Sequence, residues 1–217
     1  MVSASDVVAL NERSSYYHSM RKGEQTRTLI LNEAVSLASQ VGLEGLSIGS
    51  LAARLRLSKS GLFAHFGSKE DLQLQTLKQA QRCFEETVFR PALQIPRGMP
   101  WLRALFANWL DWIQQGNDSP GGCLILAASV EYDDRPGAVR DLLLAGQREL
   151  RGAIAKAIRL AIEEGHLRPD TDPWQLTFEL FGVVLAAHHD QRLLGDPRAL
   201  ERARSAFDRL FAARSAA

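Results

Sequence analysis

The chain has 217 residues and a mass of 24.0 kDa, which corresponds to one large domain or two small ones. Hydrophobic residues make up 46% and charged residues 24%, so the chain carries enough apolar side chains for a core and is not wholly disordered. The net charge is only +1, but eight basic and three acidic residues lie between Arg13 and Lys69. This local excess favours a polyanionic partner for the front of the chain.

Several classes of protein and site are excluded by what the chain lacks. No apolar run reaches the roughly 18 residues that cross a bilayer, so we expect no membrane partner. The first 24 residues lack the basic-then-apolar plan of a secretory signal, which favours a cytoplasmic location. Two cysteines and five histidines form no ligand spacing, so we expect no metal and no cofactor.

The front of the chain predicts four helices in succession. Apolar residues at helical spacing predict helices over 25–41, 48–55, 59–66 and 69–90. Ser47, Ser58 and Ser68 stand where the second, third and fourth of these helices need an N-cap, and Pro91 ends the fourth.

The rest of the chain predicts longer helices separated by Gly and Pro. We expect them over 101–115, 123–132, 136–164, 174–194 and 198–212. Asp172-Pro173 and Asp196-Pro197 predict the starts of the last two. The fold class is therefore all-α, with about nine helices.

The two short helices joined by Arg56-Leu57-Ser58 have the pattern of a helix-turn-helix. Four leucines are expected to point inward at the crossing: Leu51, Leu55, Leu57 and Leu62. The outward face of the second helix then carries small and polar side chains beside Phe63. Such a face is narrow enough to enter a DNA major groove, so we expect double-stranded DNA as a partner.

The stretch from Thr28 to Leu72 resembles the DNA-binding domain of tetracycline-repressor (TetR) family transcriptional regulators. The resemblance is carried by Ala34, Gly42, Leu51-Ala52 and the block from Ser58 to Phe66. It implies DNA contacts from Ser47, Ser58, Lys59, Ser60, Gly61, Phe63, His65 and Lys69. Two positions depart from the family: Arg56 stands where a small residue is frequent, and Phe63 replaces a Tyr whose hydroxyl would bind phosphate. If Arg56 has a positive φ, its side chain costs on the order of 1 kcal/mol.

The resemblance also implies a division of the chain. We expect a flexible N-terminal tail at 1–24, the helix-turn-helix domain at 25–70, and a helical ligand-binding and dimerisation domain at 71–217. The tail either reaches into a minor groove or adds only non-specific attraction to DNA. His65 either contacts DNA or packs on its own helix.

Aromatic residues of the C-terminal part predict a pocket for a small hydrophobic effector. The candidate ligand-binding residues are Trp101, Phe106, Trp109, Trp112, Cys123 and Phe178. Plain core packing is the alternative for each of them, and a sensor role for Cys123 stands beside that of a small buried residue.

Apolar stripes on the last two helices predict the interface of a homodimer, because a two-fold dimer reads a palindrome. The candidate interface residues are Phe181, Leu185, His188, Phe207, Leu210 and Phe211. We expect a repressor that a ligand releases from a palindromic operator. The alternatives are a small-molecule-binding helical protein with a vestigial helix-turn-helix and an all-helical enzyme, although the sequence offers no catalytic constellation.

Overall fold

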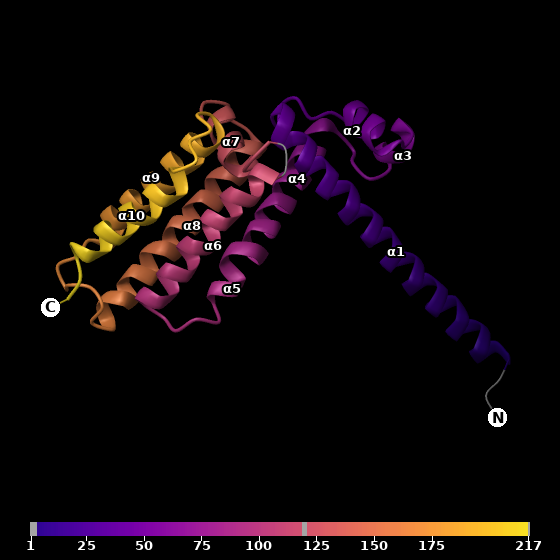
Figure 1. Ribbon diagram of the computed structural model, residues 1–217. Helices are drawn as coiled ribbons and strands as arrows, with labels where there is room; N and C mark the ends of the chain where they lie inside the picture. The colour runs from indigo at the N-terminus through magenta and orange to yellow at the C-terminus, as the bar shows by residue number, and fades with distance from the viewer. Residues whose placement is uncertain (1–3, 119–120, 217) are drawn as a thin grey trace.

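The computed structural model describes residues 4–118 and 121–216, with side chains described for 23–114 and 121–216. These residues form helices and contain no strand, which confirms the all-α prediction (Figure 1). Within the described part, no helix combines the length and the apolar character needed to cross a membrane. The first helix, α1, is longer than expected and runs Ala4–Val41. Most of the expected tail at 1–24 therefore falls on residues whose side chains lie outside the described set.

Three serines fix the starts of the next helices, as the sequence predicts. Ser47 Oγ accepts from the Ser50 amide at 3.0 Å to cap α2 (Ile48–Leu55), and Ser50 Oγ accepts from the Ser47 amide in return. Ser58 caps α3 (Lys59–Phe63), and Ser68 caps α4 (Lys69–Phe84). Each serine satisfies an amide that a helix start leaves without a partner.

Helix α3 is shorter than predicted. It ends at Phe63 rather than at Phe66, because the amide of His65 bonds to the carbonyl of Leu62 at 2.9 Å and tightens the last turn. Phe66 is nevertheless fully buried, so the turn brings its ring into the core.

The core beneath α2 and α3 extends into the second half of the chain. Buried residues of α1 to α4 pack in one cluster with residues of α7 (Leu124–Glu131) and α8 (Ala138–Glu163). The contributions from α7 and α8 include Leu124, Ala128, Val139 and Leu143. The helix-turn-helix is therefore rooted partly in elements that follow it by more than fifty residues.

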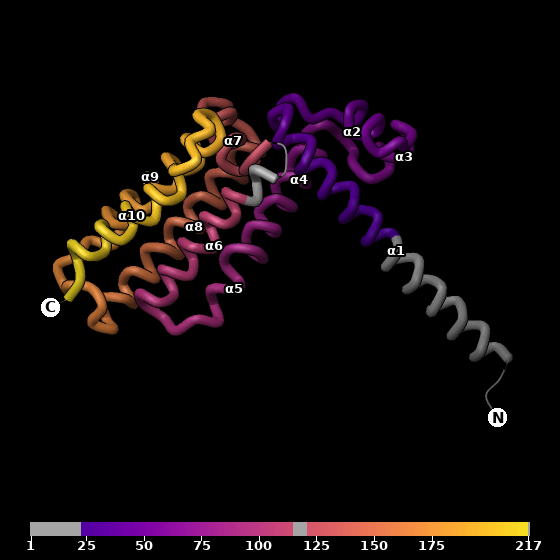
Figure 2. Tube along the Cα trace, viewed as in Figure 1, coloured from indigo at the N-terminus to yellow at the C-terminus, as the bar shows by residue number. Residues whose placement is uncertain are grey.

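A second core holds the C-terminal bundle together. It combines buried residues of α6 (Met99–Asp118), α8, α9 (Pro173–Arg192) and α10 (Ala199–Ala212). Figure 2 shows α9 and α10 together on the side of the bundle that faces away from α2 and α3. Asp172 caps α9 as predicted, accepting from the Trp174 amide at 2.8 Å. Asp196 does not cap α10: it accepts from the Arg198 amide and pairs with Arg202, and the helix begins one residue after Arg198.

A nearly continuous rod joins the two cores. Helix α4 passes into a π-helical turn, η1 (Glu85–Phe89), and then into α5 (Arg90–Ala92). Turns of π-helix are rare and occur frequently at functional sites. This one lies where the rod enters the C-terminal bundle (Figure 1).

Candidate DNA-binding surface and ligand cavity

The turn between α2 and α3 depends on one strained residue. Arg56 has φ 55° and ψ 37°, and it is the one non-glycine residue with a positive φ in the described part of the chain. The positive φ that the sequence analysis considered for Arg56 is therefore present. The turn is closed by the Leu57 amide, which bonds to the Ala52 carbonyl at 3.0 Å.

The crossing of α2 and α3 is held by fewer leucines than expected. Leu51 and Leu62 are fully buried, and Leu55 is half-buried. The expectation for Leu57 is wrong, since its side chain is 46% exposed. It follows directly after the left-handed residue, which turns the chain outward at this point.

The outward face of α3 is open to solvent. Ser58, Lys59, Ser60 and Gly61 are exposed, and Phe63 is 54% exposed although it is a large apolar residue. His65 is half-buried and lies beside Phe66, with ring centroids 6.3 Å apart. The face is therefore small and polar around one exposed ring.

Cations around this face differ in their partners. Lys69 Nζ lies 2.6 Å from Glu44 Oε1, and Arg54 pairs with Glu33 at 3.0 Å. Arg56 and Lys59 form no ion pair with any residue of the described part. These two charges are free to meet an anion at the tip of the motif.

A polar network connects this domain to the end of α7. The hydroxyl of Tyr132 donates to Glu44 Oε2 at 2.8 Å and accepts from Gln73 Nε2 at 3.0 Å. The Glu131 carboxylate accepts from the amides of Leu43 and Glu44 at 2.8 and 3.0 Å. Residues 131 and 132 thus hold the turn between α1 and α2. We call Glu44, Gln73, Glu131 and Tyr132 the α7 clamp.

The clamp shifts the pKa of two of its members. Hydrogen bonds from Lys69 and then from Tyr132 lower the pKa of Glu44 from 4.5 to about 2, so Glu44 is an anion at neutral pH. Burial and the neighbouring Glu44 carboxylate raise the pKa of Tyr132, whose hydroxyl therefore remains a donor. Gly42, with φ 81°, keeps the approach of Glu131 open, because a Cβ there would lie 3.2 Å from its Oε1.

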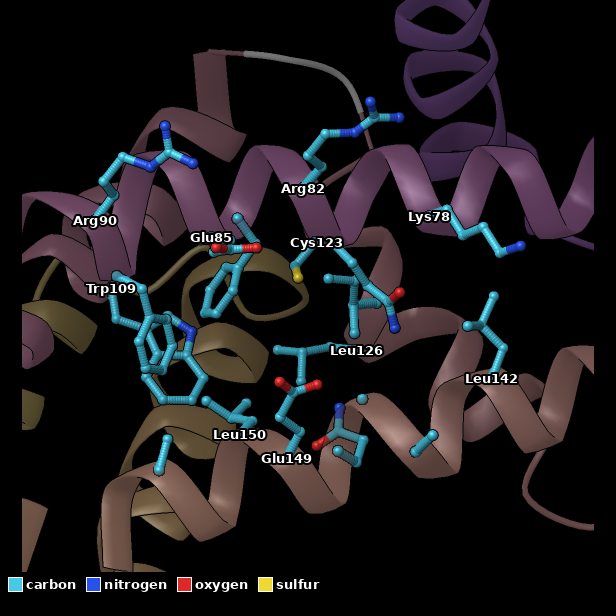
Figure 3. Close-up of a pocket in the computed structure, with 18 of the residues that line it drawn as sticks. Lys78, Arg82, Glu85, Arg90, Trp109, Cys123, Leu126, Leu142, Glu149 and Leu150 are labelled. Atoms are coloured by element: carbon cyan, nitrogen blue, oxygen red, sulfur yellow. The ribbon is translucent and has the colours of Figure 1, made fainter. Parts of the chain in front are cut away.

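A cavity of about 710 Å³ lies between α4 and η1 on one side and α8 on the other, with the start of α7 between them (Figure 3). This volume suits a drug-sized molecule. Its apolar lining includes Phe84, Phe89, Leu93, Trp109, Ile125, Leu126, Leu142 and Leu150. At one point α8 approaches α4 closely, since a Cβ on Gly146 would lie 2.4 Å from Gln81 Nε2.

Two of the six expected ligand-binding residues, Trp109 and Cys123, line this cavity. Trp101 and Trp112 lie one layer behind it, at 6.1 Å from Phe89 and 5.8 Å from Phe84 between ring centroids. Burial raises the pKa of the Cys123 thiol, so the residue is a thiol rather than a reactive thiolate.

The other two expected ligand-binding residues lie elsewhere. Phe106 is buried and stacks on Phe207 at 4.4 Å, because α6 and α10 pack directly against each other. Phe178 is 68% exposed on the outer face of α9.

The six expected interface residues divide between core and surface. Phe181, Phe207 and Phe211 are buried within the chain itself. Leu210 is half-buried, and Leu185 is 44% exposed. His188 accepts from the Cys123 amide at 3.4 Å, and burial lowers its pKa, which keeps the ring neutral. The stripe read from the sequence was thus mainly the inner face of these helices.

The outer face of α9 carries the exposed apolar residues instead. Trp174, Phe178 and Leu185 share this face and are each at least 44% exposed. Of these three residues, only Leu185 was expected at the interface. The sequence also did not predict the α7 clamp or the cavity walls on η1 and α8. The sequence does carry one related signal: the 101–115 stretch is apolar around much of its circumference. This indicates a second apolar surface but not the residues that pack against it.

An exposed helix-turn-helix joined to a helical bundle with an internal cavity defines a DNA-binding regulator with a ligand-binding domain. Two family models match the chain: "Bacterial regulatory proteins, tetR family" over residues 30–76, and "Tetracyclin repressor-like, C-terminal domain" over residues 98–207. The chain belongs to the TetR family of transcriptional regulators. No match to a curated protein was found.

Solved structures with the same fold agree with this assignment. A TetR transcriptional regulator from Chloroflexus aurantiacus is 26% identical, covers 88% of this chain and 95% of its own, and has a TM-score of 0.79. AibR, solved with isovaleryl coenzyme A and operator DNA, is 25% identical over 85% of this chain and 98% of its own, with a TM-score of 0.70. A TetR-family regulator from Streptomyces coelicolor is 22% identical over 88% and 95%, with a TM-score of 0.74, and shows the fold alone.

Proposed function

We propose that the protein is a transcriptional repressor that binds a palindromic DNA operator as a homodimer and leaves it when a small molecule occupies the cavity. The observation that carries the proposal is the exposed face of α3, where Lys59, Ser60, Gly61 and Phe63 stand clear of the core that Leu62 anchors. A face of this size enters a major groove, and Arg56 and Lys59 at its edge meet phosphates. A protein that acts on operator DNA is expected to work in the cytoplasm.

Dimerisation is supported by the outer face of α9. Trp174, Phe178 and Leu185 expose apolar surface on one side of the bundle, and small residues, Gly182 and Ala186, lie exposed among them. Exposed apolar patches of this kind mark interaction surfaces. A two-fold dimer formed through this face would contain two α3 helices, one from each subunit, and would double the contacts with DNA.

Release by a ligand is supported by the elements that the cavity shares with the DNA-binding domain. Phe84 and Glu85, at the end of α4 and the start of η1, line the cavity, and α4 begins at Lys69, shortly after α3. Ile125 and Leu126 of α7 also line it, and α7 ends at the clamp. A ligand that displaces either helix changes the position of α3. A coupling of about 1–3 kcal/mol gives a 5- to 150-fold change in operator affinity.

The structure of AibR contains both a small molecule and operator DNA. This supports the proposal that the present chain also binds a small molecule and DNA. The identity of its ligand is a property of AibR. The ligand of the present chain has to be inferred from the residues that line its own cavity.

The proposal is tested by DNA binding of two variants of the reading face. Fluorescence anisotropy is measured on a duplex recovered by selection from random DNA. Lys59→Ala and Phe63→Ala are expected to weaken binding about 5- to 30-fold each, the loss that follows from removing one direct contact. The logarithm of the affinity is expected to fall linearly with the logarithm of the salt concentration.

Matched controls lie in the C-terminal bundle. Lys156→Ala removes the same charge from an exposed site on α8, and Leu193→Ala trims an exposed apolar side chain after α9. Both are expected to leave the affinity within about twofold. Equal losses for Lys59→Ala and Lys156→Ala would show that binding follows overall charge and would refute the reading role of α3.

A further inference from the structure

We propose that the cavity binds a protonated organic amine carried on an aromatic or apolar body. This inference rests on the proposed function in one respect, since it takes the cavity to be the effector site. It is argued from two features of the walls: their carboxylates and their aromatic rings.

Two carboxylates face the cavity from opposite walls. Glu85 comes from η1 and Glu149 from α8, and both lie toward the end lined by Trp109 and Leu150 (Figure 3). Neither has a hydrogen bond or ion pair with another residue of the described part. Two negative charges without protein partners on one cavity favour a cation between them.

Three basic residues also line the cavity, namely Lys78, Arg82 and Arg90. None of them forms an ion pair with the two carboxylates. The guanidinium groups of Arg82 and Arg90 extend from the opposite side of the rod, away from the space between α4 and α8 (Figure 3). Lys78 lies at the other end of the cavity, beside Leu142. An anionic ligand would have to leave the carboxylate end empty or meet it with like charge.

Aromatic rings form the wall beside Glu85. Phe84 packs edge-on against Phe89 and Trp109, with ring centroids 6.0 and 5.4 Å apart. Both partners also line the cavity. Aromatic faces attract a cation through the ring quadrupole and also cover an apolar body, so the same wall serves both parts of the proposed ligand.

The test compares three probes that share one ring system and differ in charge: naphthylethylamine, naphthylethanol and naphthylacetate. Isothermal titration calorimetry of the full chain, without DNA, measures their dissociation constants. We expect the amine to bind at least tenfold more tightly than the alcohol and the acid. Binding of the alcohol or the acid as tightly as the amine, or binding of none of the three, overturns the inference.

Variants locate the charge that matters. Glu85→Gln and Glu149→Gln are each expected to weaken binding of the amine about five- to tenfold. Glu86→Gln is the matched control, because Glu86 is exposed on the same π-helical turn but does not line the cavity. It is expected to change the dissociation constant less than twofold. An equal loss for Glu86→Gln shows a general field effect and overturns the inference.

Operator binding is measured separately, so that the two proposals fail separately. An amine that binds as expected but leaves operator affinity unchanged supports the ligand class and contradicts the effector role of the cavity. Operator release by naphthylacetate, but not by naphthylethylamine, supports the effector role and overturns the ligand class.

Discussion

The hydroxyl of Tyr132 joins the ligand-binding bundle to the DNA-binding domain, and its removal is the most informative single change. Tyr132→Phe keeps the buried ring and deletes one hydrogen bond to the Glu44 carboxylate and one from Gln73, at 2.8 and 3.0 Å. A hydrogen bond to a charged group contributes about 1.5–3 kcal/mol, and a neutral one about 1 kcal/mol. Because the Glu44 side chain is 52% exposed, the lower end applies, and we predict a loss of about 1–2 kcal/mol.

The loss is measured by urea unfolding of the full chain, followed by circular dichroism. A double-mutant cycle of Tyr132→Phe with Glu44→Gln isolates the contact, and we expect a coupling energy of about 1 kcal/mol. The control cycle uses Glu33→Gln, since Glu33 pairs with Arg54 away from the clamp. Its coupling is expected to lie within about 0.3–0.5 kcal/mol of zero. If both cycles give the same coupling, the clamp does not hold the two parts together.

Three further predictions concern the turn, the clamp and the outer face of α9. Arg56→Gly is expected to raise the free energy of unfolding by about 0.5–1 kcal/mol, because the relief of a left-handed side chain exceeds the added entropy of the unfolded chain; a lower urea midpoint would contradict this. The pKa of Glu44 is lowered to about 2, so the folded state binds fewer protons than the unfolded one; the resulting stability is present above pH 4.5 and is lost as the pH falls toward 2. Between pH 5 and 2, the midpoint temperature of thermal unfolding should therefore fall less steeply for Glu44→Gln than for the unaltered protein. Parallel declines of the two midpoints would refute the lowered pKa of Glu44. If the protein forms the proposed dimer, Phe178→Arg is expected to convert it into a monomer in sedimentation velocity, and an unchanged dimer would remove α9 from the interface.

Much of the fold follows from local signals in the sequence. Ser47, Ser58 and Ser68 cap the helices they were expected to cap, and the positive φ considered for Arg56 is present. These features depend on a few neighbouring residues, whose hydrogen bonds and backbone sterics act over one turn of helix. The exposed face of α3 was expected for the same reason, because the spacing of Leu51 and Leu62 fixes which side is buried.

The parts that were not predicted depend on contacts between distant segments. Helical spacing shows that Phe181, Phe207 and Phe211 lie on apolar stripes, but a stripe that packs within one chain has the same period as one that packs between two chains. The same ambiguity explains why Phe178 was expected in a pocket although it lies on the surface. The clamp between Glu44 and Tyr132 joins residues 88 positions apart, and no local pattern indicates such a pair.

Selection of bound duplexes from random DNA tests the DNA-binding role most directly. A dimer with two exposed α3 helices is expected to enrich one palindromic motif, with half-site centres separated by about one helical turn or a multiple of it. The expected pattern is weaker enrichment of that motif by the Phe63→Ala variant and undiminished enrichment by Leu193→Ala. Recovery of no motif by the unaltered protein, or of the same motif by Phe63→Ala with unchanged affinity, would contradict the role assigned to α3.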